Sequence, residues 1–168
     1  MDRVSKNGYL LLNVGPKPDG TIPDEAKDLL LGMGNWLQIN GDCIYGTAPW
    51  VIASEGPTRP TTRGDYNEIN DLRFTGRDIR FTVKGENLYA IALAWPGERL
   101  LITSLAPRWD SWKGWCGLYP SEIASVSMLG DGNELKWEIT RDGLSIAMPR
   151  RKPCDHAFAI KIVRRKPF

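Results

Sequence analysis

The feature that most constrains the fold is a strand-length apolar run near the start of the chain, Tyr9–Val14. Turn residues flank the run, with Asn7-Gly8 before it and Gly15-Pro16 after it. Apolar residues that do not alternate with polar ones are typical of a strand buried on both faces, usually in a parallel sheet. Such a strand needs parallel neighbours joined by crossover connections. The chain offers no second unit of this kind, so we expect the partner strands to lie upstream.

A helix is predicted directly after this run. Thr21 and Asp24 have the spacing of a capping box, Pro23 is tolerated in a first turn, and Gly41 is predicted to end the helix. Between them, one face carries residues at helical spacing that are apolar in all but one position, which predicts an amphipathic helix. These residues are Ala26, Leu29, Leu30, Met33, Trp36, Leu37 and Asn40.

The pattern changes twice after residue 47. Residues 48–77 have little periodicity, and Glu55–Gly64 is rich in Gly, Pro and Thr, which predicts a linker or long loop. From Asp78 onward, apolar residues alternate with polar ones in short segments separated by turn residues, which predicts an antiparallel β-sandwich over residues 78–168. The predicted strands are Ile79–Val83, Leu88–Trp95, Leu100–Leu105, Ser121–Leu129, Leu135–Arg141, Leu144–Met148 and Ala157–Val163.

Composition excludes several classes of function. The net charge is only +2, from 22 basic and 20 acidic residues, so we expect neither nucleic acid nor a membrane surface as partner. Three widely spaced cysteines form neither a disulfide framework nor a zinc motif. A single histidine, His156, argues against a multi-histidine metal site, so we predict no metal and no cofactor. The seven tryptophans are the one compositional hint of contact with sugars or of heavy aromatic packing.

Several blocks resemble one known family. Ser5–Pro23 resembles the last barrel strand and following loop of the α-L-fucosidases of glycoside hydrolase family 29. Further blocks that resemble this family follow in order along the chain. They are Trp36–Gly41, Ile44–Thr47, Glu55–Thr58, Asp78–Thr82, Leu88–Ile91 and Leu129–Trp137.

The resemblance implies a (β/α) barrel followed by a β-sandwich. A complete barrel needs about 200 residues or more, whereas the residues before the linker accommodate one strand and one helix. We therefore predict a mainly β chain in which an antiparallel β-sandwich follows the last strand–helix unit of a barrel. The predicted parts are 1–47, the truncated last β/α unit, 48–77, the linker, and 78–168, the C-terminal β-sandwich.

The resemblance also implies an activity, the retaining hydrolysis of terminal α-L-fucosyl linkages by an exo-acting enzyme. That reaction uses two carboxyl groups about 5 Å apart. In the family both lie upstream of the last barrel strand, so we assign no catalytic residue here and expect this chain alone to be inactive and structural. The implied partners are the upstream barrel domain and, through the whole enzyme, a fucosylated glycan. Family members are secreted, periplasmic or lysosomal, so the compartment stays open.

Two residues are candidates for the rim of the active site. Asn13 and Gly15 stand at the carboxyl end of the predicted strand, the end that faces the active site in barrels. Asn13 would hydrogen-bond either the substrate or a catalytic neighbour, or else it caps a loop. Gly15 is interpreted as a turn residue close to the substrate.

A tryptophan-rich segment offers an alternative function. Trp109, Trp112 and Trp115 recur every three residues and Tyr119 follows, so these rings would either stack on a sugar or pack against the sandwich or the barrel. The first alternative predicts a non-catalytic carbohydrate-binding module. A third hypothesis is an interaction domain, in which the unpaired strand Tyr9–Val14 recruits another chain and leaves a homo-oligomer open.

Overall fold

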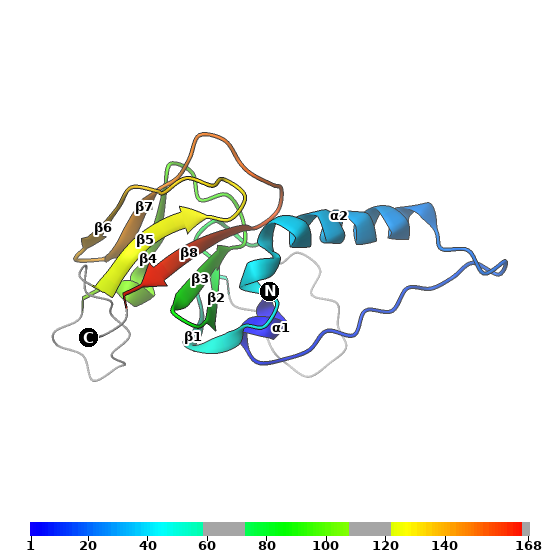
Figure 1. Ribbon diagram of the computed structural model, residues 1–168. Coiled ribbons are helices and arrows are strands. Elements are labelled where there is room, and N and C mark those ends of the chain that lie inside the picture. Colours follow the sequence, from blue (N-terminus) through cyan, green and yellow to red (C-terminus); the bar gives the residue numbers. More distant parts are fainter. Residues whose placement is uncertain (59–72, 108–121, 166–168) are drawn as a thin grey trace.

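The computed structural model describes residues 1–58, 73–107 and 122–165, and these residues form two antiparallel sheets, four short or long helical segments and their connections (Figure 1). The helical segments are α1 (Asp2–Ser5), α2 (Asp24–Asn40), η1 (Gly41–Cys43) and η2 (Thr103–Leu105). The strands are β1 (Ala48–Glu55), β2 (Ile79–Lys84), β3 (Asn87–Ala92), β4 (Arg99–Ile102), β5 (Ile123–Met128), β6 (Trp137–Thr140), β7 (Gly143–Ala147) and β8 (Phe158–Arg164).

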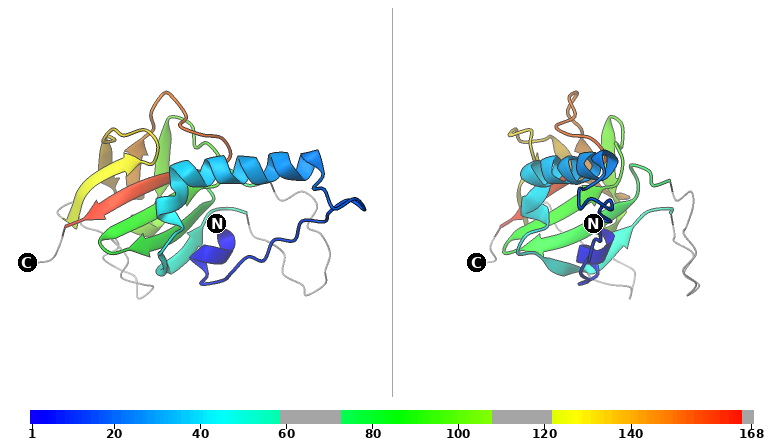
Figure 2. Two further views of the ribbon diagram at one scale, coloured as in Figure 1. Left: turned by 45° about the vertical axis from the view of Figure 1, so that its right-hand side comes forward. Right: turned by 90° about the vertical axis from the view of Figure 1, so that its right-hand side faces the viewer.

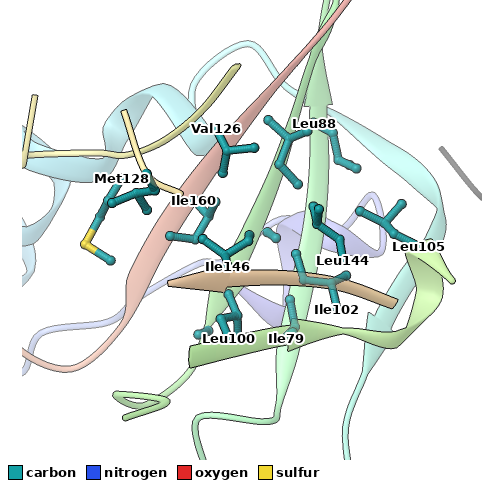
Figure 3. Packing of buried hydrophobic residues seen from close by; sticks show 14 of the residues in the cluster. Ile79, Leu88, Leu100, Ile102, Leu105, Val126, Met128, Leu144, Ile146 and Ile160 are labelled. Carbon is teal, nitrogen blue, oxygen red and sulfur yellow. The ribbon is translucent and has the colours of Figure 1, made fainter. Parts of the chain in front are cut away.

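The strands form a β-sandwich. The larger sheet has the order β1-β2-β3-β8-β5 and the smaller sheet the order β4-β7-β6, and neighbouring strands pair antiparallel in both sheets. Side chains from the two facing sheets interdigitate in one apolar core (Figure 3). Alternate residues of each strand supply this core because successive side chains of a strand point to opposite faces. The core includes Ile79, Phe81, Leu88, Ala90, Leu100, Ile102, Val126, Leu144, Ile146, Ile160 and Ile162.

The outer face of the larger sheet is covered by the start of the chain. A second apolar cluster lies there, in which Cys43 packs against Tyr89, Ile91 and Ala159. The carboxyl-terminal end of α2 lies over this face, while its amino-terminal half projects beyond the sheet together with residues 9–23 (Figures 1 and 2). Residues 1–47 therefore pack on the sandwich near both of their ends, through α1 and through the end of α2 with η1, while the part between them extends away.

The period-2 pattern located the sandwich correctly. Each of the seven predicted segments contains one strand, with ends that differ by a few residues. The smallest agreement is at Leu100–Leu105, where the strand stops at Ile102 and the chain turns into η2.

The predicted linker was wrong at its amino-terminal end. Residues 48–55 form β1, which pairs with β2 from Ala48 opposite Val83 to Glu55 opposite Ile79. Trp50 and Ile52 pack against the core while Val51 between them is exposed, so this strand follows the same alternation as the others. Its pairing is irregular, with a register shift between Pro49 and Ser54. The division of the chain into domains, with boundaries after residues 47 and 77, stays a prediction.

The segment Tyr9–Val14, predicted as a barrel strand whose partner strands lie upstream, has no partner strand among the described residues. The segment is extended but pairs with no strand in the described part of the chain, and Tyr9 is 97% exposed and Leu11 89% exposed. A strand that is apolar on both faces needs a neighbour on each side and a cover above and below. The described part of the chain supplies no such neighbour, so the segment is exposed to solvent.

The helix begins later than its predicted cap. α2 starts at Asp24 with Pro23 as its N-cap, and no side chain caps it. Thr21 instead forms a turn in which its backbone N–H and its hydroxyl both donate to Asp19 Oδ1, at 3.0 and 2.7 Å. That local bond competes with capping, as Asp and Thr side chains commonly do. The predicted end of the helix at Gly41 was right. The backbone of Gly41 has the right-handed helical conformation, and the chain continues into η1.

Candidate functional site

An apolar groove of about 1090 Å³ lies between α2 and the first residues of the chain. One wall is the face of α2 that includes Leu29, Met33 and Trp36, and the other wall includes Val4 and Leu10. Leu29 is 72% exposed and Met33 is 44% exposed, so the face predicted to be core is open to solvent in its amino-terminal half. Trp36, nearer the sandwich, is half-buried.

The helix α2 contains two glycines, Gly32 and Gly34. A Cβ atom added to Gly32 or Gly34 would meet no other atom within 4 Å, and Gly32 itself lines the groove. Glycine inside a helix costs about 1 kcal/mol relative to alanine, and nothing in the described part of the chain uses the space that it leaves. The helix surface is therefore unusually open where it faces the groove.

Charged side chains surround the apolar floor. Glu25 and Asp28 of α2 stand on one side of the groove, and Arg3 of α1 on the other. His156 also lines it, with a φ of 72°. That left-handed backbone fits the expectation that His156 is a turn residue before the last strand.

Asp2 joins the groove to the sandwich. Arg80 Nε of β2 donates to Asp2 Oδ1 at 2.6 Å, and Lys6 Nζ donates to Asp2 Oδ2 at 2.9 Å. Burial raises the pKa of Asp2, but the hydrogen bonds from Lys6 and Arg80 outweigh it, so the pKa lies below its usual value. Asp2 is therefore an ionised structural group at neutral pH.

A second carboxylate, Asp42, anchors the end of α2. Lys84 Nζ donates to Asp42 Oδ1 at 2.8 Å, and the Tyr89 hydroxyl donates to Asp42 Oδ2 at 2.7 Å. The hydrogen bond from Lys84 is the largest influence that lowers the pKa of Asp42, followed by that from Tyr89. Burial, together with the same bond to Asp42, raises the pKa of Tyr89 far above its usual value. Neither group is suited to exchange protons near neutral pH.

Asp78 connects two described ranges of the chain, residues 1–58 and residues 73–107. It is fully buried and accepts hydrogen bonds from the backbone N–H and the hydroxyl of both Thr58 and Thr75, at 2.8 to 2.9 Å. Burial raises its pKa, but these four bonds prevail and the pKa lies below the ordinary 3.8. Asp78 thus holds together two chain segments, and its buried carboxylate serves structure.

The predicted site residues are not assembled into a site in this chain. Asn13 and Gly15 are exposed in the unpaired segment, and Asn13 has no hydrogen-bond partner among the described residues. The predicted stacking residues Trp109, Trp112, Trp115 and Tyr119 lie outside the described residues, so that prediction stays open.

Sequence reasoning missed the groove and its anchors. The amphipathic pattern of α2 was recognised, but it was interpreted as core because a helix face of this kind is usually covered. Gly32 within that face was the signal that could have marked an open surface. The Asp2–Arg80 pair had no signal, because its members are 78 positions apart.

No site for a metal ion is formed by the described residues, since nowhere in them do three or more His, Cys, Asp or Glu side chains gather suitably. The described helices also include none that is both long and apolar enough to cross a membrane. Cys43 is fully buried, and burial raises the pKa of its thiol to about 12, so it is not a reactive nucleophile at neutral pH.

Two family models match the chain. The model described as "Alpha-L-fucosidase" matches residues 1–42, and the model described as "Alpha-L-fucosidase C-terminal domain" matches residues 71–163. The first match covers α1, the unpaired segment and α2, and the second covers all strands except β1 and the last residue of β8.

Curated relatives align along almost the whole chain. The chain is 33% identical over 166 residues to an α-L-fucosidase from Branchiostoma floridae and 31% identical over 164 residues to the tissue α-L-fucosidase of Homo sapiens. These alignments cover 96% and 95% of the chain but only 30% and 29% of the relatives. The chain therefore spans about a third of the length of the curated relatives that it matches.

Solved structures have the same fold. A crystal structure of Thermotoga maritima α-fucosidase in complex with a mechanism-based inhibitor superimposes with a TM-score of 0.69 at 32% identity, over 96% of this chain and 32% of that chain. An α-L-fucosidase isoenzyme from Paenibacillus thiaminolyticus superimposes with a TM-score of 0.67 at 25% identity, over 98% of this chain. The arrangement of α2 and the sandwich is thus shared with larger proteins.

Proposed function

The chain belongs to the α-L-fucosidases of glycoside hydrolase family 29, as their C-terminal part, and from this premise we propose that it serves a retaining, exo-acting enzyme that removes terminal α-L-fucosyl residues. In that enzyme the sandwich and α2 support the catalytic barrel. The substrate is a fucosylated glycan, bound by the whole enzyme. The chain alone is inactive.

One observation carries this proposal. Of the eleven exposed large apolar side chains in the described part of the chain, eight lie within residues 1–42, which match the "Alpha-L-fucosidase" family model. Exposed apolar patches on this scale mark surfaces that are covered in the functional assembly. The exposed residues within 1–42 are Tyr9, Leu10, Leu11, Leu12, Ile22, Leu29, Leu31 and Met33.

The barrel domain is the occupant that this surface fits. Its open groove is apolar at the floor and carries Glu25 and Asp28 on one side, so it suits a packed domain with basic groups at its edge. The extended segment beside the groove has unpaired backbone groups along both edges, which a strand of the barrel would satisfy. We propose that Tyr9–Val14 becomes a barrel strand only when that domain is present.

The chemistry is proposed to reside outside this chain. Retaining hydrolysis uses two carboxyl groups about 5 Å apart, one as nucleophile and one as general acid and base. Three carboxylates whose pKa lies below the usual value, Asp2, Asp42 and Asp78, are committed to structural hydrogen bonds. In the assembled enzyme Asn13 and Gly15 would lie at the rim of the active site, where the Asn13 amide would hydrogen-bond the substrate or a catalytic neighbour.

The test is complementation. The chain is assayed on an aryl α-L-fucoside alone and mixed with a separately produced α-L-fucosidase barrel that lacks the part equivalent to this chain. We expect release of the aryl group only from the mixture. Turnover by the purified chain alone would contradict the proposal, and so would a silent mixture in which the two parts bind each other.

A matched pair of variants locates the contact. Leu29→Asp puts a charge into the exposed part of the groove, whereas Leu101→Asp puts the same charge on an exposed site of β4 in the smaller sheet. We expect Leu29→Asp to abolish complementation and Leu101→Asp to leave it intact. Equal effects of both variants would refute the assignment of the groove.

A further inference from the structure

We propose that the outer face of the larger sheet is a positioning device, which holds the strand–loop–helix unit at both ends and so sets where its loop meets the active site. The upstream anchor is Arg80 on Asp2, and the downstream anchor is Tyr89 with Lys84 on Asp42. The inference rests on the proposed function, because the loop has an active site to meet only in the assembled enzyme.

The upstream anchor is rigid. Arg80 is only 3% exposed, and its Nε donates to Asp2 Oδ1 at 2.6 Å while its Nη1 donates to the Ile79 carbonyl at 3.1 Å. The ring of Phe74 lies 5.4 Å from the guanidinium carbon, which adds a cation–π contact. Such a charge-assisted hydrogen bond, with its donor held on other sides, is among the stronger single contacts of a protein.

The position of Asp2 is transmitted to the apolar segment through the end of α1. The Gly8 N–H donates to the Arg3 carbonyl at 2.7 Å and the Asn7 N–H donates to the Val4 carbonyl at 3.1 Å. With Asn7 at a φ of 60°, these two bonds form a Schellman motif. The motif fixes the direction in which the chain leaves α1. Because Arg80 holds α1 through Asp2, it also determines where Tyr9–Val14 begins.

The downstream anchor holds the end of α2 on the neighbouring strand. The Tyr89 hydroxyl and Lys84 Nζ both donate to Asp42, and the Thr82 hydroxyl donates to the Cys43 carbonyl at 2.8 Å. Thr82 of β2 and Tyr89 of β3 are directly paired in the sheet. The turn after α2 is therefore held by two adjacent strands.

Both anchors stand on the same two strands. Arg80 and Thr82 are two residues apart on β2, and Tyr89 is opposite Thr82 on β3. The unit between the anchors, residues 9–40, makes few contacts of its own along its outer half, where Leu29 and Leu11 are exposed. Its position in the enzyme therefore depends on how firmly the sheet grips its ends. Arg80 and Tyr89 are positioning residues, and neither touches the substrate.

Hydrogen exchange of the 168-residue chain tests the grip directly. Arg80→Met removes the donor of the upstream bond, Asp2→Asn removes the negative charge that strengthens it, and Tyr89→Phe removes a downstream bond, while Arg99→Met removes an exposed ion pair on the smaller sheet as a control. We expect the first two variants to raise exchange of the Asn7 and Gly8 amides by about tenfold, the change that the loss of one charge-assisted hydrogen bond produces. Tyr89→Phe should do the same for the amides of residues 44 and 45.

The core amides decide how the result is interpreted. The backbone amides of β3 and β8 should exchange at the wild-type rate in all variants. Uniformly faster exchange, or no local change in Asp2→Asn, which removes only a half-exposed carboxylate, would overturn the inference. If Arg80→Met does not fold, Asp2→Asn supplies the upstream result.

Complementation supplies the functional arm. At saturating amounts of chain, the mixture that contains Asp2→Asn or Tyr89→Phe should have a lower kcat than wild type, and the Arg99→Met mixture should equal wild type. Equal kcat in all four mixtures would overturn the inference while leaving the proposed function intact. If no mixture is active, the proposed function fails, and the exchange data still report whether the sheet holds the two ends.

Discussion

The indole Nε1 of Trp36 donates a 2.8 Å hydrogen bond to the carbonyl of Ala157, a residue 121 positions later. This bond joins the carboxyl-terminal third of α2 to the turn before β8. The side chains of β8 alternate between the core and the outer face of the larger sheet. The helix that lines the groove is thus held by the last strand of the sandwich as well as by the first turn after the helix.

The first prediction concerns this bond. Trp36→Phe keeps an aromatic ring on the outer face but removes the indole donor, so the Ala157 carbonyl keeps only the weak Cys154 thiol as donor, and we expect a loss of about 1 kcal/mol in the free energy of unfolding. Urea unfolding followed by circular dichroism measures it. Gln38→Ala, at an exposed position of the same helix, is the control. A Trp36→Phe midpoint equal to that of the control would contradict the prediction.

The second prediction concerns Asp78 and pH. Its folded pKa lies below the ordinary 3.8, so the carboxylate stabilises the fold above that value, and the contribution is lost as the pH falls through the folded pKa. Asp78→Asn keeps the shape but turns an NH2 donor toward either the Thr58 N–H or the Thr75 N–H, and we expect it to cost about 2–3 kcal/mol near pH 7.

The gap between wild type and Asp78→Asn should narrow progressively below about pH 4, because the wild-type carboxyl is then protonated as well. Unfolding curves at several pH values measure this gap. A gap that stays constant, or widens, down to acid pH would show that the four hydrogen bonds do not depend on the ionised form.

The third prediction concerns the groove glycine. Gly32→Ala adds a methyl group that meets nothing within 4 Å, in the interior of α2, so it should stabilise the isolated chain by about 0.5–1 kcal/mol. If a barrel domain packs closely here, the same change should weaken complementation. Thermal unfolding of the chain and titration of the barrel measure the two effects. A destabilised chain, or unchanged complementation, would count against an open helix face that is filled on assembly.

The fourth prediction concerns the aromatic segment. If Trp109, Trp112, Trp115 and Tyr119 stack on sugars, Trp112→Ala should weaken the binding of fucosylated glycans by about tenfold, the effect of losing one well-packed ring. Trp50→Phe, which alters a ring packed on the sandwich core, is the control. Amide chemical shifts during glycan titration measure binding. No response of the unaltered chain at millimolar glycan would refute the carbohydrate-binding alternative.

Local patterns were sufficient to predict the sandwich. Segments such as Ile79–Val83 and Leu144–Met148 alternate strictly enough to predict both a strand and the face that is buried, and their core residues are those that the structure buries. The amphipathic face of α2 and its end at Gly41 were predictable for the same reason, since helical spacing and a glycine stop are local signals.

The candidate site was less predictable, because its determinants are contacts between distant residues. A period-3.6 stripe predicts that α2 has an apolar face but does not tell what covers it, and Met33, predicted as core, is 44% exposed. From the sequence, Arg80 is an ordinary outward-facing residue of a strand. Its role becomes visible only in the structure, where α1 lies over it and Asp2 accepts its hydrogen bond. β1 was missed because Trp50, Val51 and Ile52 are consecutive apolar residues, so the sequence there does not alternate although the burial of these side chains does.

The sequence by itself determined the family and the alternation that builds two sheets, because both depend on residue types at short separations. It also determined that Tyr9–Val14 requires partner strands, since an apolar segment of that length is unsuited to solvent. Only the tertiary structure decided that this segment stays unpaired here, while the unit that contains it is held at Asp2 by Arg80 and at Asp42 by Tyr89. The physical reason is that burial and hydrogen bonding depend on which distant groups meet in space, and strand-length patterns carry no record of those meetings.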